Sequence, residues 1–304
     1  MGIMYDRLKI IGNHPEIRNV RRRIRRVAPQ DLNVIIYGEA GTEKELVARE
    51  IHLKSLRDPD IFEALDCCEL IEPDPDAAEE ILQQTFTNAQ EGTLFLDNID
   101  VMPPAIQQKL YYMLTARKKP VIPAPVQKPR GVRIIAATTD YDYEEHNGFN
   151  KHLALLINRY AITVAPVRKR KSDIPLLFDY YYTLAAEKHG YKEKPAVSDE
   201  IFQSILTYEW KGNLEEMKNT INALLDMSPK DELSPEALPF IIPENPMKFL
   251  EHFDYHTALA KVEEYLIRRA LEHSGWNQTR AAQFLNMSEG NIRLKIKKYA
   301  IKKE

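Results

Sequence analysis

Cysteine is nearly absent from this 304-residue chain. The two cysteines, Cys67 and Cys68, are neighbours in sequence, and adjacent cysteines rarely bridge each other. The chain therefore lacks the disulfide framework that stabilises small secreted domains. This composition favours a protein of the reducing cytosol, and we expect a cytoplasmic location.

Long apolar runs, leader features and metal-ligand spacings are absent as well. No apolar run reaches the roughly 18 residues needed to span a bilayer. The N-terminus, MGIMYDRLKIIG, lacks the apolar core and the cleavage site of a secretory signal. The eight histidines are scattered and show no ligand spacing with Cys or Asp. We therefore expect neither a membrane segment nor a metal site.

Basic residues are missing from one long stretch and concentrated in another. Residues 58–108 contain thirteen acids and no Lys or Arg, whereas residues 291–304 contain six basic residues and one acid. The net charge of −3 hides this asymmetry, which indicates that the C-terminal end meets nucleic acid. A second basic cluster runs from Arg21 to Arg26, interrupted only by Ile24. It is either an exposed helix face or a contact for phosphates.

The remaining composition, 44% apolar and 29% charged residues, is typical of a globular protein with two or three compact units. Short apolar runs alternate with amphipathic stretches, and this alternation favours a parallel sheet covered by helices on both faces. The expected strands are residues 33–38, 93–97, 132–138 and 160–165, and the expected helices are residues 16–27, 44–56, 76–90 and 104–116.

The strand pattern stops after the basic turn that begins at Pro166. Helix-starting residues at 172, 198 and 213 predict a small all-helical unit, and the Pro-rich stretch 228–250 is typical of a linker. We therefore expect an α/β core of a parallel sheet, a small helical lid and an all-α C-terminal domain. The expected boundaries are 1–165 for the core, 166–243 for the lid, 244–255 for the linker and 256–304 for the last domain.

The C-terminal segment GWNQTRAAQFLNMSEGNIRLKIKKYAIKK predicts two short helices joined by a tight turn. Asn277 or Thr279 can cap the first helix and Ser288 the second, and small alanines at the crossing allow the close packing of a helix-turn-helix. The second helix is basic and fits the major groove, with its first turn at base edges and its cations at phosphates. The candidate DNA-binding residues are Asn277, Gln278, Thr279, Arg280, Ser288, Glu289, Asn291, Arg293, Lys295 and Lys298.

This segment closely resembles the DNA-binding domain of the Fis family. The residues that carry the resemblance are NQTRAA at 277–282 and KKY at 297–299. The resemblance implies a double-stranded DNA partner and a homodimer formed through the long helix at 258–271. One departure is Glu289, at a base-reading position that is often Arg in the family. A carboxylate there accepts from cytosine and repels phosphate, which predicts an unusual binding site.

Residues 38–45, GEAGTEKE, lie between an expected strand and an expected helix. A phosphate-binding loop needs glycines that let backbone N–H groups surround the phosphates and a Lys for their charge. This loop and the segments GTLFLDNID, RIIAATTD, APVRKRKSDIPLL and YEWKGNLEEMKNTI resemble the AAA+ domain of bacterial enhancer-binding proteins, the activators of sigma-54 polymerase, over residues 10–243. The candidate nucleotide-binding residues are Gly38, Glu39, Gly41, Thr42, Lys44, Glu45 and Asp97.

Position by position, the resemblance implies that the catalytic residues are missing. The glycine before the loop Lys is Glu43 here, which places a negative charge near the phosphates. Of the Asp-Glu pair that binds Mg²⁺ and polarises the attacking water, Asp97 is present but Asn98 replaces the Glu, and an amide cannot act as a base. The polar sensor, usually Asn, is Thr139.

The arginines of the family site are also replaced. The arginine fingers fall at Asn150 and Leu156, and Arg159 does not align without a gap. The second sensor, an Arg in the lid, is Glu215. Loss of one such arginine costs about 10³-fold or more in rate. We therefore predict no catalytic residues and no ATP hydrolysis. Either Lys44 and Asp97 hold ATP or ADP with Mg²⁺, or the loop is a relic without a ligand.

The sigma-54 contact of the family, a loop reading GAFTGA, has no counterpart between Leu65 and Gly92. That segment instead carries acids that are either a solvated surface or a contact for a basic partner. We therefore predict a sequence-specific DNA-binding regulator whose inactive AAA+ domain serves oligomerisation or ligand sensing. RNA polymerase or another regulator is the expected partner. The alternatives are an active ATPase with unusual residues and a receptor for a cyclic dinucleotide, bound through the cluster from Arg21 to Arg26.

Overall fold

The computed structural model describes residues 9–71, 74–116, 131–145, 148–227, 233, 263, 266–268, 270–271, 274–285, 287–299 and 301. The chain divides into two compact units, Met1–Leu238 and Pro239–Glu304, each of which is described by itself. The predicted linker at 244–255 and most of the predicted dimer helix at 258–271 lie outside the described residues. Within the described part, no helix is long and apolar enough to cross a membrane.

The first unit contains a five-stranded sheet in which every paired strand is parallel. The strands are β1 (Val34–Tyr37), β2 (Phe62–Asp66), β3 (Thr93–Asp97), β4 (Arg133–Thr138) and β5 (Ala161–Thr163), and their order is β2-β3-β4-β1-β5. The predicted parallel α/β core is confirmed. The sequence analysis missed β2, because this strand pairs only with β3 and its polar residues give no continuous apolar run.

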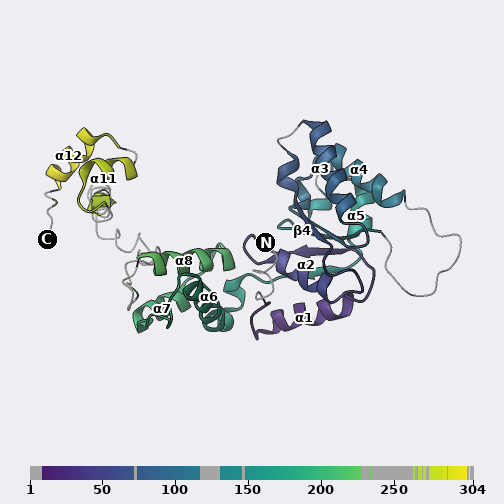
Figure 1. The fold of residues 1–304 in the computed structure, drawn as a ribbon, viewed down its shortest axis with the longest axis horizontal. Helices are drawn as coiled ribbons and strands as arrows, with labels where there is room; N and C mark the ends of the chain where they lie inside the picture. Colours follow the sequence, from purple (N-terminus) through teal and green to yellow (C-terminus); the bar gives the residue numbers. More distant parts are fainter. Residues whose placement is uncertain are drawn as a thin grey trace. The chain divides into compact units, whose positions relative to one another are not determined.

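Helices cover both faces of the sheet (Figure 1). One face packs against α1 (Pro15–Val27) and α2 (Lys44–Leu53), through buried residues such as Val20 and Ile51. The other face packs against α3 (Pro75–Asn88), α4 (Pro104–Thr115) and α5 (Lys151–Ile157), through residues such as Leu82, Leu110 and Leu153. Short 3-10 turns lie at η2 (Cys67–Leu70), η3 (Ile99–Val101), η4 (Tyr143–Glu145), η5 (Val167–Lys169) and η6 (Lys171–Asp173).

Both ends of α1 are held by residues from distant parts of the sequence. At its start, Asp173 Oδ1 accepts hydrogen bonds from the backbone N–H groups of Asn13 (2.7 Å) and His14 (2.9 Å). At its end, the buried guanidinium of Arg133 donates to the carbonyls of Val27 (3.0 Å) and Ala28 (3.1 Å). These bonds satisfy backbone groups that a helix leaves unpaired at its termini and fix the helix on the sheet.

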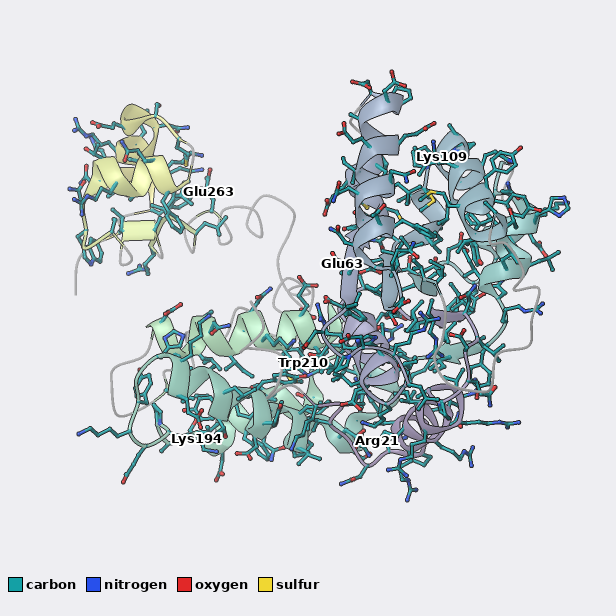
Figure 2. All side chains as sticks on the ribbon, turned by 45° about the vertical axis from the view of Figure 1, so that its right-hand side comes forward. Arg21, Glu63, Lys109, Lys194, Trp210 and Glu263 are labelled. Atoms are coloured by element: carbon teal, nitrogen blue, oxygen red, sulfur yellow. The ribbon has the colours of Figure 1, made fainter. Side chains whose placement is uncertain are left out.

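The lid consists of α6 (Ile174–Lys188), α7 (Asp199–Thr207) and α8 (Asn213–Met227), close to the three helices expected from the sequence. Trp210 is fully buried among them, and its indole N–H donates to the Ile205 carbonyl at 3.0 Å (Figure 2).

In the second unit, α11 (Gln278–Phe284) and α12 (Glu289–Lys298) form the predicted pair of short helices around a small core. The core contains the two alanines of α11, Ala281 and Ala282, and Ile292 of α12.

Candidate functional sites: the phosphate loop and the helix-turn-helix

The loop at 38–43 follows β1 and leads into α2, as the sequence predicts. It lies at the carboxyl edge of a parallel sheet, where such folds bind ligands. Gly41 has a φ of 74°, and a Cβ at this position would lie 2.2 Å from the carbonyl oxygen of Gly212 in the lid. Only glycine fits here, because the lid packs directly on the loop. Glu45 lies in the first turn of α2 and pairs instead with Arg49 at 2.7 Å.

Lys44, the expected phosphate ligand, makes its hydrogen bonds within the loop. Its side chain is buried, and Nζ donates to the carbonyls of Gly38 (3.1 Å) and Glu39 (3.4 Å). The hydroxyl of Thr42 also donates to the Glu39 carbonyl, at 2.7 Å. Burial lowers the pKa of the Lys44 ammonium, while Asp97 opposes that shift. The side chains of Lys44 and Thr42 are therefore both bound to backbone carbonyls of the loop itself.

Glu43, where the sequence analysis expects a phosphate-loop glycine in the family, connects the loop to the lid. It adopts a φ of 64°, a left-handed conformation that costs a non-glycine residue free energy. Its carboxylate accepts hydrogen bonds from Lys218 Nζ of α8 (2.5 Å) and from Tyr181 Oη of α6 (2.8 Å). Burial raises the pKa of the Tyr181 phenol, so this group remains a donor at any physiological pH. An anion of the protein thus bridges the loop and two lid helices.

Three further contacts hold the lid on the loop. The buried amide of Asn213 donates to the Ala40 carbonyl at 2.8 Å, and its oxygen accepts from the backbone N–H of Val167 at 2.9 Å. The backbone N–H of Leu214 donates to the Gly41 carbonyl at 2.9 Å. Arg168 makes a bidentate ion pair with Glu39, which lowers the pKa of that carboxyl. Side-chain and backbone groups of both parts therefore hold the lid on the loop.

The cavity beside the loop has a volume of only ≈ 10 Å³. It is lined by Thr42 and Glu43 of the loop, by Ile10 and Ile11 before α1, and by other side chains that include Arg170. A space of this size holds about one water molecule, whereas pockets for nucleotide-sized ligands usually measure about 300 Å³ or more. Within the described part of the chain, Nε and Nη2 of the buried Arg170 have no hydrogen-bond partner.

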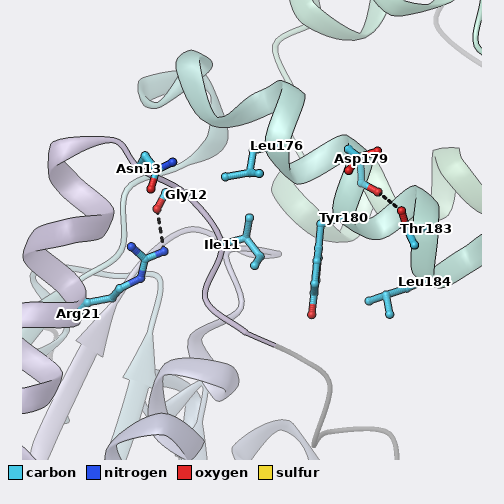
Figure 3. A pocket seen from close by; sticks show the side chains of 9 residues that line it. All are labelled: Ile11, Gly12, Asn13, Arg21, Leu176, Asp179, Tyr180, Thr183 and Leu184. Atoms are coloured by element: carbon cyan, nitrogen blue, oxygen red, sulfur yellow. Dashed lines mark hydrogen bonds between the residues drawn. The ribbon is translucent and has the colours of Figure 1, made fainter.

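A larger hollow of ≈ 290 Å³ lies between residues 11–13 and α6 (Figure 3). Arg21, which faces it, donates to the carbonyls of Gly12 (2.7 Å) and Ile10 (2.8 Å). Arg21 therefore holds the segment before α1 in place. The hypothesis that Arg21 belongs with the arginines up to Arg26 as a phosphate contact needs correction at this residue.

Asp97 and Asn98 lie at the end of β3, where the sequence predicts a metal-binding acid and a missing base. Burial raises the pKa of Asp97, and the nearby Lys44 opposes the shift. The Asn98 amide donates to Asp66 Oδ1 of the neighbouring strand at 2.9 Å. Thr139, the expected sensor position, is exposed, and the polar residue that closes β4 is the buried Thr138. In the described part, no group of three His, Cys, Asp or Glu side chains is arranged to hold a metal ion.

The caps of the C-terminal helices are those expected from the sequence. Asn277 Oδ1 accepts from the backbone N–H of Arg280 at 3.1 Å at the start of α11, and Ser288 Oγ accepts from that of Asn291 at 3.3 Å at the start of α12. Such caps stabilise short helices by about 1 kcal/mol each. They also fix the turn between the helices, which orients α12 on the small core.

The exposed face of α12 differs in part from the expected one. Glu289, Asn291 and Arg293 are exposed as predicted, and Arg293 makes a loose ion pair with Glu289 at 3.5 Å. Lys295, in contrast, is half-buried and pairs with Glu263, which lies before α11 in the sequence. The hydrogen bond from Lys295 lowers the pKa of Glu263, as does a second one from Tyr299. Lys295 therefore binds a carboxylate of its own domain, in contrast to its predicted role as a DNA-binding residue.

Two residues of this face were missed by the sequence analysis. Leu294 is 69% exposed, and Lys297 is exposed close to it. Both lie on the same side of α12 as Gly290, at intervals of four and seven residues, so helical periodicity alone could have indicated them. An exposed Leu on a basic helix suits the methyl group of a thymine.

Three family models match successive parts of the chain. They are the sigma-54 interaction domain at residues 11–167, the AAA+ ATPase lid domain at 168–249, and the bacterial regulatory protein, Fis family, at 258–299. The transcriptional regulatory protein ZraR of Salmonella typhimurium is 31% identical over 301 residues, which cover 94% of this chain and 68% of ZraR. The C4-dicarboxylate transport regulator DctD of Rhizobium meliloti is 32% identical over 226 residues, or 70% of this chain and 49% of DctD.

The chain belongs to the bacterial enhancer-binding protein family. It is a transcriptional regulator of the sigma-54-interaction type with a Fis-type helix-turn-helix DNA-binding domain. A solved structure of NtrX from Brucella abortus in complex with ADP has a TM-score of 0.68 with 23% identity, covering 98% of this chain and 71% of that one. This likeness confirms the AAA+ fold.

The residues at which the sequence analysis expects the family's arginines make other contacts. The Asn150 side chain caps α5 by accepting from the backbone N–H of His152 (3.0 Å) and donates to Gln108 (2.9 Å). Leu156 uses its carbonyl to bind the Asn33 amide at 2.9 Å. Glu215 is exposed in the first turn of α8. Arg159 is exposed at the end of the turn after α5.

Proposed function

We propose that this regulator acts by occupying DNA, through an AAA+ domain that neither hydrolyses ATP nor requires it to close. The observation that carries the proposal is the Glu43 carboxylate, which sits in the phosphate loop and is bound by Lys218 and Tyr181 of the lid. The Glu43 carboxylate supplies the negative charge that a nucleotide phosphate would supply in the family's loop. A nucleotide entering the loop would have to displace these bonds against charge repulsion.

The residues around Asp97 support the same proposal. The side chain that follows it, Asn98, is an amide held by Asp66, and Glu215 in the lid repels phosphate instead of stabilising it. The lid already contacts the loop through protein groups. Nucleotide binding would therefore contribute little to bringing the lid onto the loop. The domain then serves as a scaffold for oligomers or for contacts with other proteins.

The mode of regulation follows from the absence of a GAFTGA sequence in the chain. Without that loop, we propose contact with RNA polymerase or another regulator in place of remodelling of the sigma-54 enzyme. The C-terminal domain is proposed to dimerise through residues 258–271 and to bind DNA through the exposed residues of α12, with Gln278, Thr279 and Arg280 of α11 near the backbone. A dimer doubles the contact with a palindromic site.

The test is phosphate release by the purified full chain, with and without duplex DNA, compared with Lys44→Ala. We expect both proteins to give the same rate as buffer. Turnover that is present in the wild type and vanishes in the Lys44→Ala variant would establish an active ATPase and overturn the proposal. DNA binding measured on the same preparations shows that each protein is folded and competent.

A further inference from the structure

One face of α1 carries an unusual density of exposed arginines. We call Arg18, Arg22, Arg23, Arg25 and Arg26 the α1 arginine face. Around the helix these residues occupy one contiguous arc, opposite the buried stripe of Ile17, Val20, Ile24 and Val27. Four of the five are exposed, and the fifth, Arg23, lies over the ring of Tyr160 at 5.5 Å. Nitrogen-tipped side chains project from α1 into solvent (Figure 2).

These guanidinium groups differ from the other arginines of the domain in their partners. Arg57 pairs with Asp31, Arg133 donates to backbone carbonyls, and Arg168 pairs with Glu39. Among the described residues, no carboxylate lies within ion-pair distance of the α1 arginine face, and Arg22 donates only to the amide oxygen of Asn19, at 2.8 Å. Five neighbouring cations without an anion repel one another, so an anionic ligand would stabilise the face.

The helix dipole explains only part of this arrangement. Arg25 and Arg26 lie in the last turn, where positive charge interacts favourably with the helix terminus. Arg18 lies at the end of the first turn, where the dipole does not stabilise a cation, and Arg22 lies in the middle of the helix, beyond the reach of the dipole. The dipole therefore does not account for the position of these two charges.

The face is rigid and open at the same time. Bonds from Asp173 and Arg133 hold the two ends of α1, so the arginines are presented from a fixed backbone. A hollow of ≈ 520 Å³ lies along them, lined by Arg22, Arg23, Arg26, Asn19 and Tyr160. Arginine binds phosphate oxygens through two parallel N–H bonds, which makes such a hollow suitable for phosphodiesters.

The length of the face distinguishes an extended ligand from a compact one. Arg18 and Arg26 are eight residues apart, which corresponds to about 12 Å along the helix axis. A DNA duplex carries one negative charge per about 1.7 Å of its axis when both strands are counted, so a face of this length can meet more than one phosphate. α1 exposes no large apolar side chain with which to enter a membrane. The spacing favours a linear polyanion.

We propose that the α1 arginine face binds backbone phosphates of the DNA duplex that the helix-turn-helix reads. This inference rests on the proposed function as a DNA-binding regulator. The contact is independent of base sequence, because guanidinium groups on phosphates carry no base information. It gives the AAA+ domain a direct part in DNA occupancy.

The experiment measures DNA binding of the full chain by fluorescence anisotropy over a series of salt concentrations. The test variant is Arg22→Ala/Arg26→Ala, and the matched control is Lys151→Ala/Lys192→Ala, which removes two exposed cations outside α1. Each lost phosphate contact lowers the slope of log K against log salt by about one. For any duplex, we expect the magnitude of this slope to be smaller by about two in the test variant than in the wild type. The control variant should keep the wild-type slope.

The charge-retaining variant Arg22→Lys/Arg26→Lys should recover most of the slope. Equal slopes for the test and control variants would overturn the proposal. The proposal would also be overturned if Arg22 and Arg26 were needed for binding of a short phosphodiester dinucleotide but had no effect on the salt slope of DNA binding. The failure of the proposed function looks different: a wild-type chain that binds no duplex, or whose binding survives disruption of α12, contradicts that function itself.

Discussion

The phosphate loop and the helix-turn-helix differ in what their polar side chains contact. In the loop, Lys44, Glu39 and Glu43 all bind groups of the protein itself. On α12, Asn291 and Arg293 are exposed to solvent. The comparison teaches that packing and hydrogen bonding can maintain a backbone while the polar side chains on it are bound within the protein in one region and exposed in the other.

The largest expected effect is the selective unfolding of the second unit, which contains the helix-turn-helix. Ile292→Ala removes a fully buried side chain from the small core of the second unit, at a cost of about 2–5 kcal/mol. We expect this unit to unfold and DNA binding to be lost, while the thermal transition of the first unit stays unchanged. Calorimetry and anisotropy measure both. The control is Leu294→Ala, an equal truncation at an exposed position of the same helix, which should keep the fold.

The second prediction sharpens the comparison on the DNA side. Glu289 is exposed at the first turn of α12, so replacing it by Arg should change which base is preferred at one position, by about 1–3 kcal/mol. Selection of bound sequences from a random duplex pool measures the preference, and Glu289→Gln controls for loss of charge without a new donor. Identical preferences in all three proteins would show that residue 289 does not read bases.

The third prediction concerns nucleotide binding by the phosphate loop after Glu43 is replaced by glycine. Glu43→Gly removes the carboxylate bound by Lys218 and Tyr181 and relieves the positive φ. We expect at least a tenfold gain in affinity for ATP with Mg²⁺, or about 1.4 kcal/mol, by calorimetry. Hydrolysis should remain absent, because the amide at position 98 stays. Glu43→Gln serves as the control, since it removes charge and retains the strained backbone. An unchanged affinity in Glu43→Gly would assign the block to the apolar walls of the cavity.

The smallest effect concerns pH and the first unit alone. His52 is buried against Thr93 (2.9 Å) and the Pro59 carbonyl (3.2 Å), and burial lowers its pKa below the ordinary 6.5. The unfolded chain then binds the proton more readily than the folded one. The contribution to stability is therefore complete above pH 6.5 and is lost as the pH falls below it, by at most about 1.4 kcal/mol per pH unit. Chemical unfolding at pH 7.5 and 5.5 should show this loss in the wild type and a smaller one in His52→Gln.

Sequence patterns alone predicted most of the fold, because its elements carry strong local signals. Strands β1, β3 and β4 are largely buried runs of mostly apolar residues, and the caps at Asn277 and Ser288 are local interactions between neighbouring residues. The replacements predicted at Glu43, Asn98 and Glu215 also come from the sequence, since each is a change in the chemical type of a side chain within a motif.

The tertiary structure decided which polar groups are already bound. No local pattern indicates that Glu43 accepts a hydrogen bond from Lys218, 175 residues away. Likewise, no local pattern indicates that Arg21 donates to backbone carbonyls while Arg22 is exposed. The edge strand β2 was also invisible, because its stability comes from pairing with β3 and from few apolar contacts of its own. The sequence determines which chemistry each residue offers. Long-range packing determines whether that chemistry is used within the protein or remains exposed for a ligand.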